Sequence, residues 1–74
     1  MEKEFLKGYR VQIGKQLKMI REAQGWSIEQ VDTMAGVKEV TIEKIEEGAF
    51  NVPFDLMVSV AEVLGAKIVL KERS

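Results

Sequence analysis

The chain has 74 residues, enough for one small domain and too few for a multi-domain enzyme. It contains no cysteine and no histidine, which excludes disulfide bonds and thiolate metal sites and removes the commonest metal ligand and general base. Hydrophobic residues make up 46% and charged residues 31%, the composition of a soluble globular domain. No apolar run approaches the ~20 residues of a membrane span and the N-terminus does not resemble a signal peptide, so we expect a cytoplasmic protein that does not enter a membrane.

Charge is distributed unevenly, although the whole chain carries a net charge of only −1. Residues 1–22 hold six basic and three acidic side chains, a net charge of +3, whereas residues 23–62 hold two and eight, a net charge of −6. Residues 63–74 return to +2. A polyanionic partner must therefore be met by a local basic face, because the molecule as a whole does not attract one.

A long helix is predicted over about Glu4 to Gln24, because apolar residues recur there at spacings of four, four, four and three. Gly14 lies inside this helix at a cost of about 1 kcal/mol relative to alanine, which indicates a close packing contact. Gly25 ends the helix as a C-cap. The apolar stripe consists of Phe5, Tyr9, Ile13, Leu17 and Ile20.

Two short helices follow, separated by a glycine. Ser27 and Gln30 have the spacing of a capping box, which predicts a second helix over residues 28–35. Gly36 interrupts the helical pattern, and a third helix is predicted over residues 37–47.

A fourth helix is predicted after a loop. Gly48 closes the third helix, and the loop runs to Pro53, which stands just before or at the first position of the next helix. Gly65 ends that helix. Its inward residues are Leu56, Val60, Val63 and Leu64.

The last segment changes from helical to strand periodicity. Residues 66–71 alternate between two sides, which predicts a short β-strand; a frayed or helical tail is the alternative. One strand leaves backbone donors and acceptors unpaired, and the same strand of a second copy is the simplest partner. We therefore expect residues 1–66 to form the domain and residues 67–74 to form a dimerisation element. The predicted interface residues are Ile68, Val69 and Leu70.

The second and third helices have the pattern of a helix-turn-helix unit over residues 28–46. Such a unit needs apolar residues where its helices cross and a turn residue that tolerates a positive φ angle, which Gly36 supplies. The apolar positions are Val31, Ala35, Val37, Ile42 and Ile45.

Several separate motifs, in the same order, strengthen this interpretation. The stretches 13–27, 35–37, 41–48 and 61–65 resemble the lambda repressor-like (XRE/Cro-type) helix-turn-helix family, and the resemblance covers about residues 11–66. It implies an all-α domain of four to five helices, here with a short C-terminal β-strand. It also implies a commonly dimeric protein that binds specific sequences of double-stranded DNA.

The resemblance further implies roles for individual side chains. Arg21 and Glu46 match positions that form a partly buried ion pair between the first helix and the end of the recognition helix; two solvated surface charges are the alternative. The recognition helix begins near Lys38. Its outward residues, predicted to contact bases in the major groove, are Lys38, Glu39, Val40, Glu43 and Lys44. The predicted phosphate contacts are Lys15, Lys18, Ser27, Ile28 and Asn51.

The chain also departs from the family pattern in ways that oppose DNA affinity. Ile28 stands where members usually carry a Gln or another polar residue, which removes a side-chain phosphate contact. Asp32 stands where a small residue is usual, and we expect it to need a hydrogen-bond partner such as Thr41 or Lys38. Residues 27–48 hold two basic and six acidic side chains, a net charge of −4, which weakens phosphate binding.

Two functions are consistent with these observations. The first is a homodimeric, sequence-specific DNA-binding transcriptional regulator, with an antitoxin-type autoregulator that has a toxin partner as a subtype. The alternative is a protein-interaction module that keeps the fold and uses its acidic third helix to bind a basic partner, with little affinity for DNA. Neither needs a cofactor or a metal ion, and without histidine and cysteine we expect no enzymatic activity.

Overall fold

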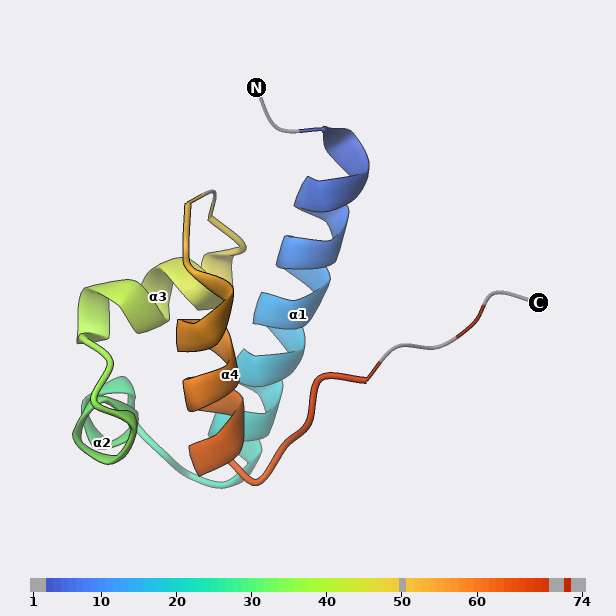
Figure 1. The fold of residues 1–74 in the computed structure, drawn as a ribbon. Coiled ribbons are helices and arrows are strands. Elements are labelled where there is room, and N and C mark those ends of the chain that lie inside the picture. The colour runs from blue at the N-terminus through green and yellow to red at the C-terminus, as the bar shows by residue number, and fades with distance from the viewer. Residues whose placement is uncertain (1–2, 50, 70–71, 73–74) are drawn as a thin grey trace.

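The computed structural model describes residues 3–49, 51–69 and 72. Within these residues the predicted all-α helix-turn-helix fold is confirmed (Figure 1). The helix α1 packs against α3, and α2 packs against both α3 and α4. The helices are α1 (Glu4–Ala23), α2 (Ile28–Ala35), α3 (Glu39–Glu47) and α4 (Phe54–Val63).

The start of α2 is fixed by the predicted capping box. The Gln30 N–H donates to Ser27 Oγ over 3.1 Å, and the Ser27 N–H donates to Gln30 Oε1 over 2.8 Å. These two bonds satisfy amides that a helix start otherwise leaves without acceptors. The helix therefore begins where the sequence predicts it.

The start of α3 differs from the prediction. We predicted the third helix from Val37, but α3 begins at Glu39 and Lys38 is its N-cap, with φ −57° and ψ 146°. Val37 is buried although its backbone is not helical. Its apolar side chain reaches the core from the turn before α3. The spacing of apolar residues does not distinguish this position from one inside a helix.

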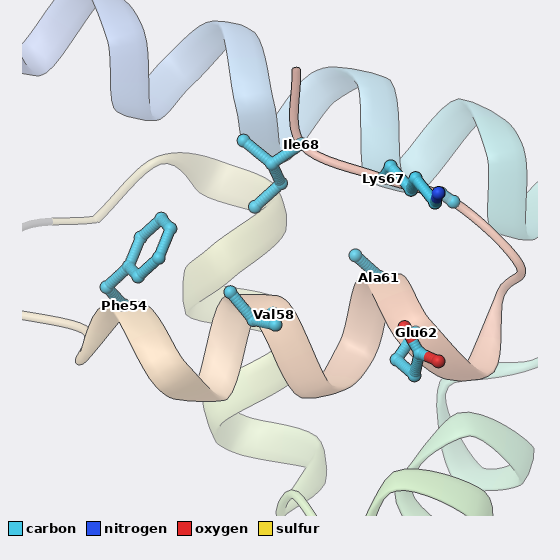
Figure 2. Close-up of a pocket in the computed structure, with 7 residues that line it drawn as sticks. Phe54, Val58, Ala61, Glu62, Lys67 and Ile68 are labelled. Carbon is cyan, nitrogen blue, oxygen red and sulfur yellow. The ribbon is translucent and has the colours of Figure 1, made fainter. Parts of the chain in front are cut away.

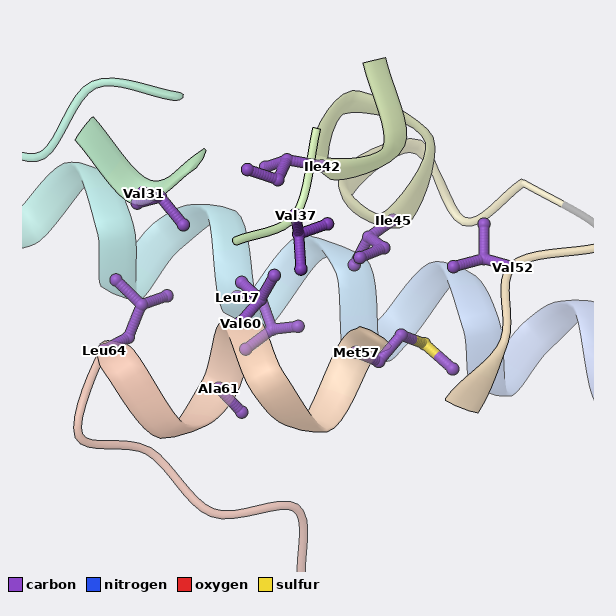
Figure 3. Packing of buried hydrophobic residues seen from close by; sticks show 10 residues of the cluster. All are labelled: Leu17, Val31, Val37, Ile42, Ile45, Val52, Met57, Val60, Ala61 and Leu64. Carbon is purple, nitrogen blue, oxygen red and sulfur yellow. The ribbon is translucent and has the colours of Figure 1, made fainter. Parts of the chain in front are cut away.

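The core lies where the four helices and the loop before α4 meet (Figure 3). Val31 of α2 and Ile42 of α3 are completely buried. Each such side chain contributes about 1.5–3 kcal/mol through its removal from water. The buried cluster consists of Leu17, Val31, Val37, Ile42, Ile45, Val52, Met57, Val60, Ala61 and Leu64.

The close packing contact predicted at Gly14 is confirmed. A Cβ atom at this position would collide with the carbonyl oxygen of Ile45 and lie 3.0 Å from that of Glu46. Only glycine lets α1 approach the C-terminal end of α3 this closely. The contact fixes the distance between these two helices.

The apolar stripe of α1 is buried along only half of its length. Leu17 is buried, and Ile13 and Ile20 pack against the core from half-buried positions. Phe5 and Tyr9, however, are 61% and 60% exposed. The first turns of α1 extend past the N-terminal end of α4, so no described part of the same chain covers them (Figure 1).

The predicted C-terminal strand is not formed within the described residues. Residues 66–69 have no regular secondary structure, and Leu70 and Lys71 lie outside the described part. A β-strand needs a hydrogen-bonded neighbour, and all the regular elements of the described chain are helices. Ile68 packs against the core, whereas Val69 is 76% exposed. Pairing with a second copy therefore stays a prediction.

Candidate nucleic-acid interface

The helix α3 presents one side to the core and the other to the outside. Ile42 and Ile45 hold the inner side. Val40 lies on the outer side and is 55% exposed. All the side chains predicted to contact bases are exposed, namely Lys38, Glu39, Val40, Glu43 and Lys44.

The turn before α3 holds this outward orientation. Gly36 has a φ of 68°, in the left-handed region that a side chain disfavours, and its N–H donates to the carbonyl oxygen of Asp32 over 2.8 Å. The tight turn lets α2 pack directly against α3. With α1 also packed against it, α3 is supported from two helices and keeps its exposed side free.

An ion pair joins α1 to the C-terminal end of α3. Arg21 Nε donates to Glu46 Oε2 over 2.6 Å, and Arg21 Nη2 donates to Glu46 Oε1 over 3.1 Å. The two side chains are only 10% and 7% exposed, so the pair expected from the resemblance is present and largely buried. The hydrogen bond to Glu46 raises the pKa of the Arg21 guanidinium above its usual range, although burial opposes the shift, and the guanidinium stays charged.

Arg21 has a third partner that the sequence does not indicate. Its Nη1 donates to the carbonyl oxygen of Trp26 over 2.8 Å. One guanidinium therefore fixes three elements relative to one another: α1, the segment that leads into α2, and the end of α3.

Comparison with known proteins assigns this arrangement to a family. A family model described as Helix-turn-helix matches residues 17–70, which is 54 of the 74 residues. The chain belongs to the helix-turn-helix family. The match is of the XRE/lambda repressor-like type, a family of DNA-binding regulators that is generally non-enzymatic. No curated protein and no solved structure matches the chain.

The chain is thus a DNA-binding helix-turn-helix regulator in general terms. In the described residues, no helix has the length and hydrophobicity that a bilayer crossing requires. No group of three or more carboxylates there is arranged to hold a metal ion.

The predicted phosphate contacts of this helix-turn-helix protein lie on three elements. At the start of α2 the Ser27 amide is engaged by Gln30, and helical geometry leaves the amides of Ile28 and Glu29 without intrahelical acceptors. Lys15 and Lys18 are exposed on α1. Asn51 is exposed in the loop before α4 with a φ of 76°, a conformation that asparagine tolerates better than most residues.

Acidic side chains of α1 and α3 line the same groove. The net charge of the sequence alone does not reveal this groove. Glu22 of α1 and Glu43 and Glu47 of α3 line it, together with Ile28, Lys18 and the Arg21–Glu46 pair. Glu22 and Glu43 lie 21 positions apart in the sequence, and only the crossing of α1 and α3 brings them together. The carboxylates reduce the attraction of Lys18 for a phosphate.

The hydrogen-bond partner expected for Asp32 is not needed. Asp32 is half-buried, and no buried side-chain oxygen or nitrogen in the described residues lacks a partner. Water therefore solvates the Asp32 carboxylate, and neither Thr41 nor Lys38 has to compensate for it.

Proposed function

We propose that this helix-turn-helix protein is a sequence-specific transcriptional regulator that binds double-stranded DNA with α3 in the major groove. The observation that supports this function best is the free side of α3. Glu39, Val40 and Glu43 face outward, while the opposite side of the same helix is held in the core. A helix with these properties fits the width of the major groove.

Each exposed side chain of α3 matches the chemistry of a base edge. A lysine ammonium donates to the guanine acceptors or to a phosphate, a glutamate accepts from the cytosine amino group, and a valine contacts the thymine methyl group. We assign these roles to Lys38 and Lys44, to Glu39 and Glu43, and to Val40. The phosphate contacts come from Lys15, Lys18, Asn51, Ser27 and the start of α2 at Ile28.

A homodimer places two α3 helices in successive major grooves about 34 Å apart. We propose that residues 67–74 pair with the same residues of a second copy, with Val69 and its neighbours Ile68 and Leu70 at the contact. The 76% exposure of Val69 supports this assignment. We further propose a cytoplasmic protein without enzymatic activity. An antitoxin-type autoregulator is the subtype favoured by a C-terminal pairing segment next to a helix-turn-helix domain.

A second candidate function is supported by the acidic groove. Glu22, Glu43 and Glu47 line it beside the outer side of α3, and among the described residues Lys18 is the one cation that lines it outside the ion pair. Such a surface suits a basic partner protein better than a phosphate backbone. In this alternative the chain keeps the fold and binds a protein rather than an operator.

One experiment distinguishes the two proposed functions: the full chain is used to select DNA duplexes from a random pool. The DNA-binding proposal expects enriched sequences with two-fold symmetry and half-sites one helical turn apart. Affinity for the selected duplex should fall steeply between low and physiological salt, in proportion to the phosphates neutralised. A pool that stays random at low salt contradicts the proposal and favours the protein-interaction module.

Lysine variants test whether α3 is the reading element. Lys38→Ala and Lys44→Ala should each weaken binding to the selected duplex roughly tenfold, with unchanged helix content by circular dichroism. Met34→Ala changes an exposed residue of α2 outside the predicted contacts and serves as the control. Unchanged binding in both α3 variants would remove α3 from this role.

A further inference from the structure

The side-chain amide of Gln24, the C-cap residue of α1, makes two hydrogen bonds that the predicted DNA contacts do not include. Its Nε2 donates to the carbonyl oxygen of Leu64 over 2.7 Å, and its Oε1 accepts from Trp26 Nε1 over 2.9 Å. Because an indole N–H only donates and a carbonyl oxygen only accepts, this orientation of the amide satisfies both partners. The amide therefore connects the end of α1, the segment before α2 and the end of α4.

The bond to Leu64 reaches a fixed point of the fold. Leu64 is the C-cap of α4 and is buried. Beyond it the chain turns back along α4, where Ile68 packs against the core and lies across a groove from Val58 (Figure 2). Apolar side chains thus hold the chain on both sides of this turn. The Gln24 amide is anchored at its donor end.

Trp26 is held at two places, one on its backbone and one on its ring. Arg21 Nη1 donates to the Trp26 carbonyl oxygen over 2.8 Å, and Gln24 accepts from the indole N–H. The ring is half-buried and packs against the core. Trp26 stands directly before Ser27, the N-cap of α2. Fixing both the carbonyl and the ring therefore restricts the backbone at the point where α2 begins.

The start of α2 is where the proposed function places a phosphate contact. The amides of Ile28 and Glu29 have no intrahelical acceptors, and they donate to a phosphate only when the first turn of α2 points at it. A backbone amide has no rotatable side chain with which to correct its direction. The orientation of the segment before α2 therefore decides how well these amides meet a phosphate.

We propose that Gln24 is a positioning residue for DNA binding: through Trp26 it holds the first turn of α2 in the orientation that its phosphate contact requires. The inference rests on the DNA-binding function proposed above and adds to it a residue outside the predicted contacts. The bond between Gln24 and Trp26 is exposed to water, so its removal should leave the chain folded.

A double-mutant cycle tests whether Gln24 acts through Trp26. Gln24→Leu keeps a side chain of similar size without its hydrogen-bonding groups, and Trp26→Phe keeps an aromatic ring without the indole N–H. Each variant should bind the selected duplex roughly threefold to tenfold more weakly, the loss expected for one hydrogen bond. The double variant should bind no more weakly than the weaker single variant, because both substitutions remove the same link. Fluorescence anisotropy of a labelled duplex measures these affinities.

Sequence preference separates positioning from base reading. Phosphate contacts carry no base information, so Gln24→Leu should weaken binding to the selected duplex and to a scrambled duplex by the same factor. Val40→Ala, at a proposed base contact, should instead reduce the preference for the selected duplex. Ser59→Ala is the matched control, because it removes an exposed hydrogen bond, from Ser59 Oγ to the Asp55 carbonyl oxygen, within α4. Its affinity for both duplexes should equal that of the wild type.

The indole N–H gives a second readout that needs no DNA. Trp26 is the one tryptophan of the sequence, so the amide NMR spectrum contains a single indole N–H resonance. This resonance should move in Gln24→Leu, which has no acceptor, and stay near its wild-type position in Gln24→Glu, which keeps one. A resonance that does not move in Gln24→Leu would overturn the proposal.

The outcomes distinguish this inference from the proposed function. A Gln24→Leu variant that binds the selected duplex as tightly as the wild type overturns the positioning role and leaves DNA binding intact. Unchanged binding by Trp26→Phe, or losses that multiply in the double variant, would mean that Gln24 does not act through Trp26 and would also overturn it. A wild-type chain that selects no duplex rejects both proposals. Circular dichroism and urea unfolding of each variant ensure that binding is compared between folded chains.

Discussion

The two halves of α1 carry the same apolar periodicity and have opposite surroundings. From Gly14 to Ala23 the helix includes buried Gly14, Leu17 and Arg21, whereas no residue of α1 before Gly14 is buried. In the first half the stripe exposes Phe5 and Tyr9. Periodicity thus identifies an apolar surface without identifying what covers it: from Gly14 to Ala23 the same chain covers the stripe, whereas Phe5 and Tyr9 are exposed in the described structure.

The largest expected change in the free energy of unfolding comes from a substitution in the buried half of α1. Arg21→Ala leaves the Glu46 carboxylate without its cation and the Trp26 carbonyl without its donor, and we expect a loss of about 3 kcal/mol in the free energy of unfolding. Urea unfolding of the chain measures it. Because a buried charge without a partner causes most of this loss, Arg21→Ala combined with Glu46→Ala should be less destabilised than the single variant. A melting temperature equal to that of the wild type would contradict the role of the pair.

Glycine substitutions compare the two halves directly. Gly14→Ala places a methyl group against the Ile45 carbonyl oxygen, and we expect a loss of about 2 kcal/mol, since α1 and α3 must move apart. Gly8→Ala meets no atom within 4 Å and should stabilise the helix by up to about 1 kcal/mol. Thermal unfolding of the two variants, side by side, shows whether the same substitution has opposite signs in the two halves. Equal changes in the melting temperature of the two variants would mean that α1 does not approach α3 closely at Gly14.

The smallest expected change in the free energy of unfolding comes from a substitution in the exposed half of α1. Tyr9→Ala should change the free energy of unfolding by less than about 0.5 kcal/mol at dilutions where the chain is monomeric, since Tyr9 is 60% exposed. Unfolding measured at increasing protein concentration tests this limit, because a contact between copies makes stability depend on concentration. A large loss at high dilution would show that Tyr9 packs within its own chain.

The local elements follow from the sequence because their determinants are local. The Ser27–Gln30 capping box fixes the start of α2, and the bounds of α2 match the predicted residues 28–35. Periodicity places Val37 in the third helix, whereas it lies in the turn before α3, because an apolar side chain can enter the core from a turn as well as from a helix. The strand at 66–71 has the required periodicity, but a strand also needs a neighbour that the described chain does not provide.

The candidate site was predictable where the family resemblance supplied the pairing. Arg21 and Glu46 lie 25 residues apart, so spacing alone could not join them. The contact of Arg21 with the Trp26 carbonyl and the grouping of Glu22 with Glu43 depend on how the helices cross, and the sequence carries no local signal for either. The base and phosphate contacts stay predictions that only a bound duplex can test.

The contacts between α1 and α3, among them those at Gly14 and at Arg21, have a mechanical consequence. The twenty residues of α1 form one uninterrupted helix of about 30 Å that runs from its exposed first turns to these contacts. A rod of this kind passes a tilt at one end to the other. Because α3 is fixed to the other half of this helix, a force on the exposed first turns of α1 is passed to the orientation of α3.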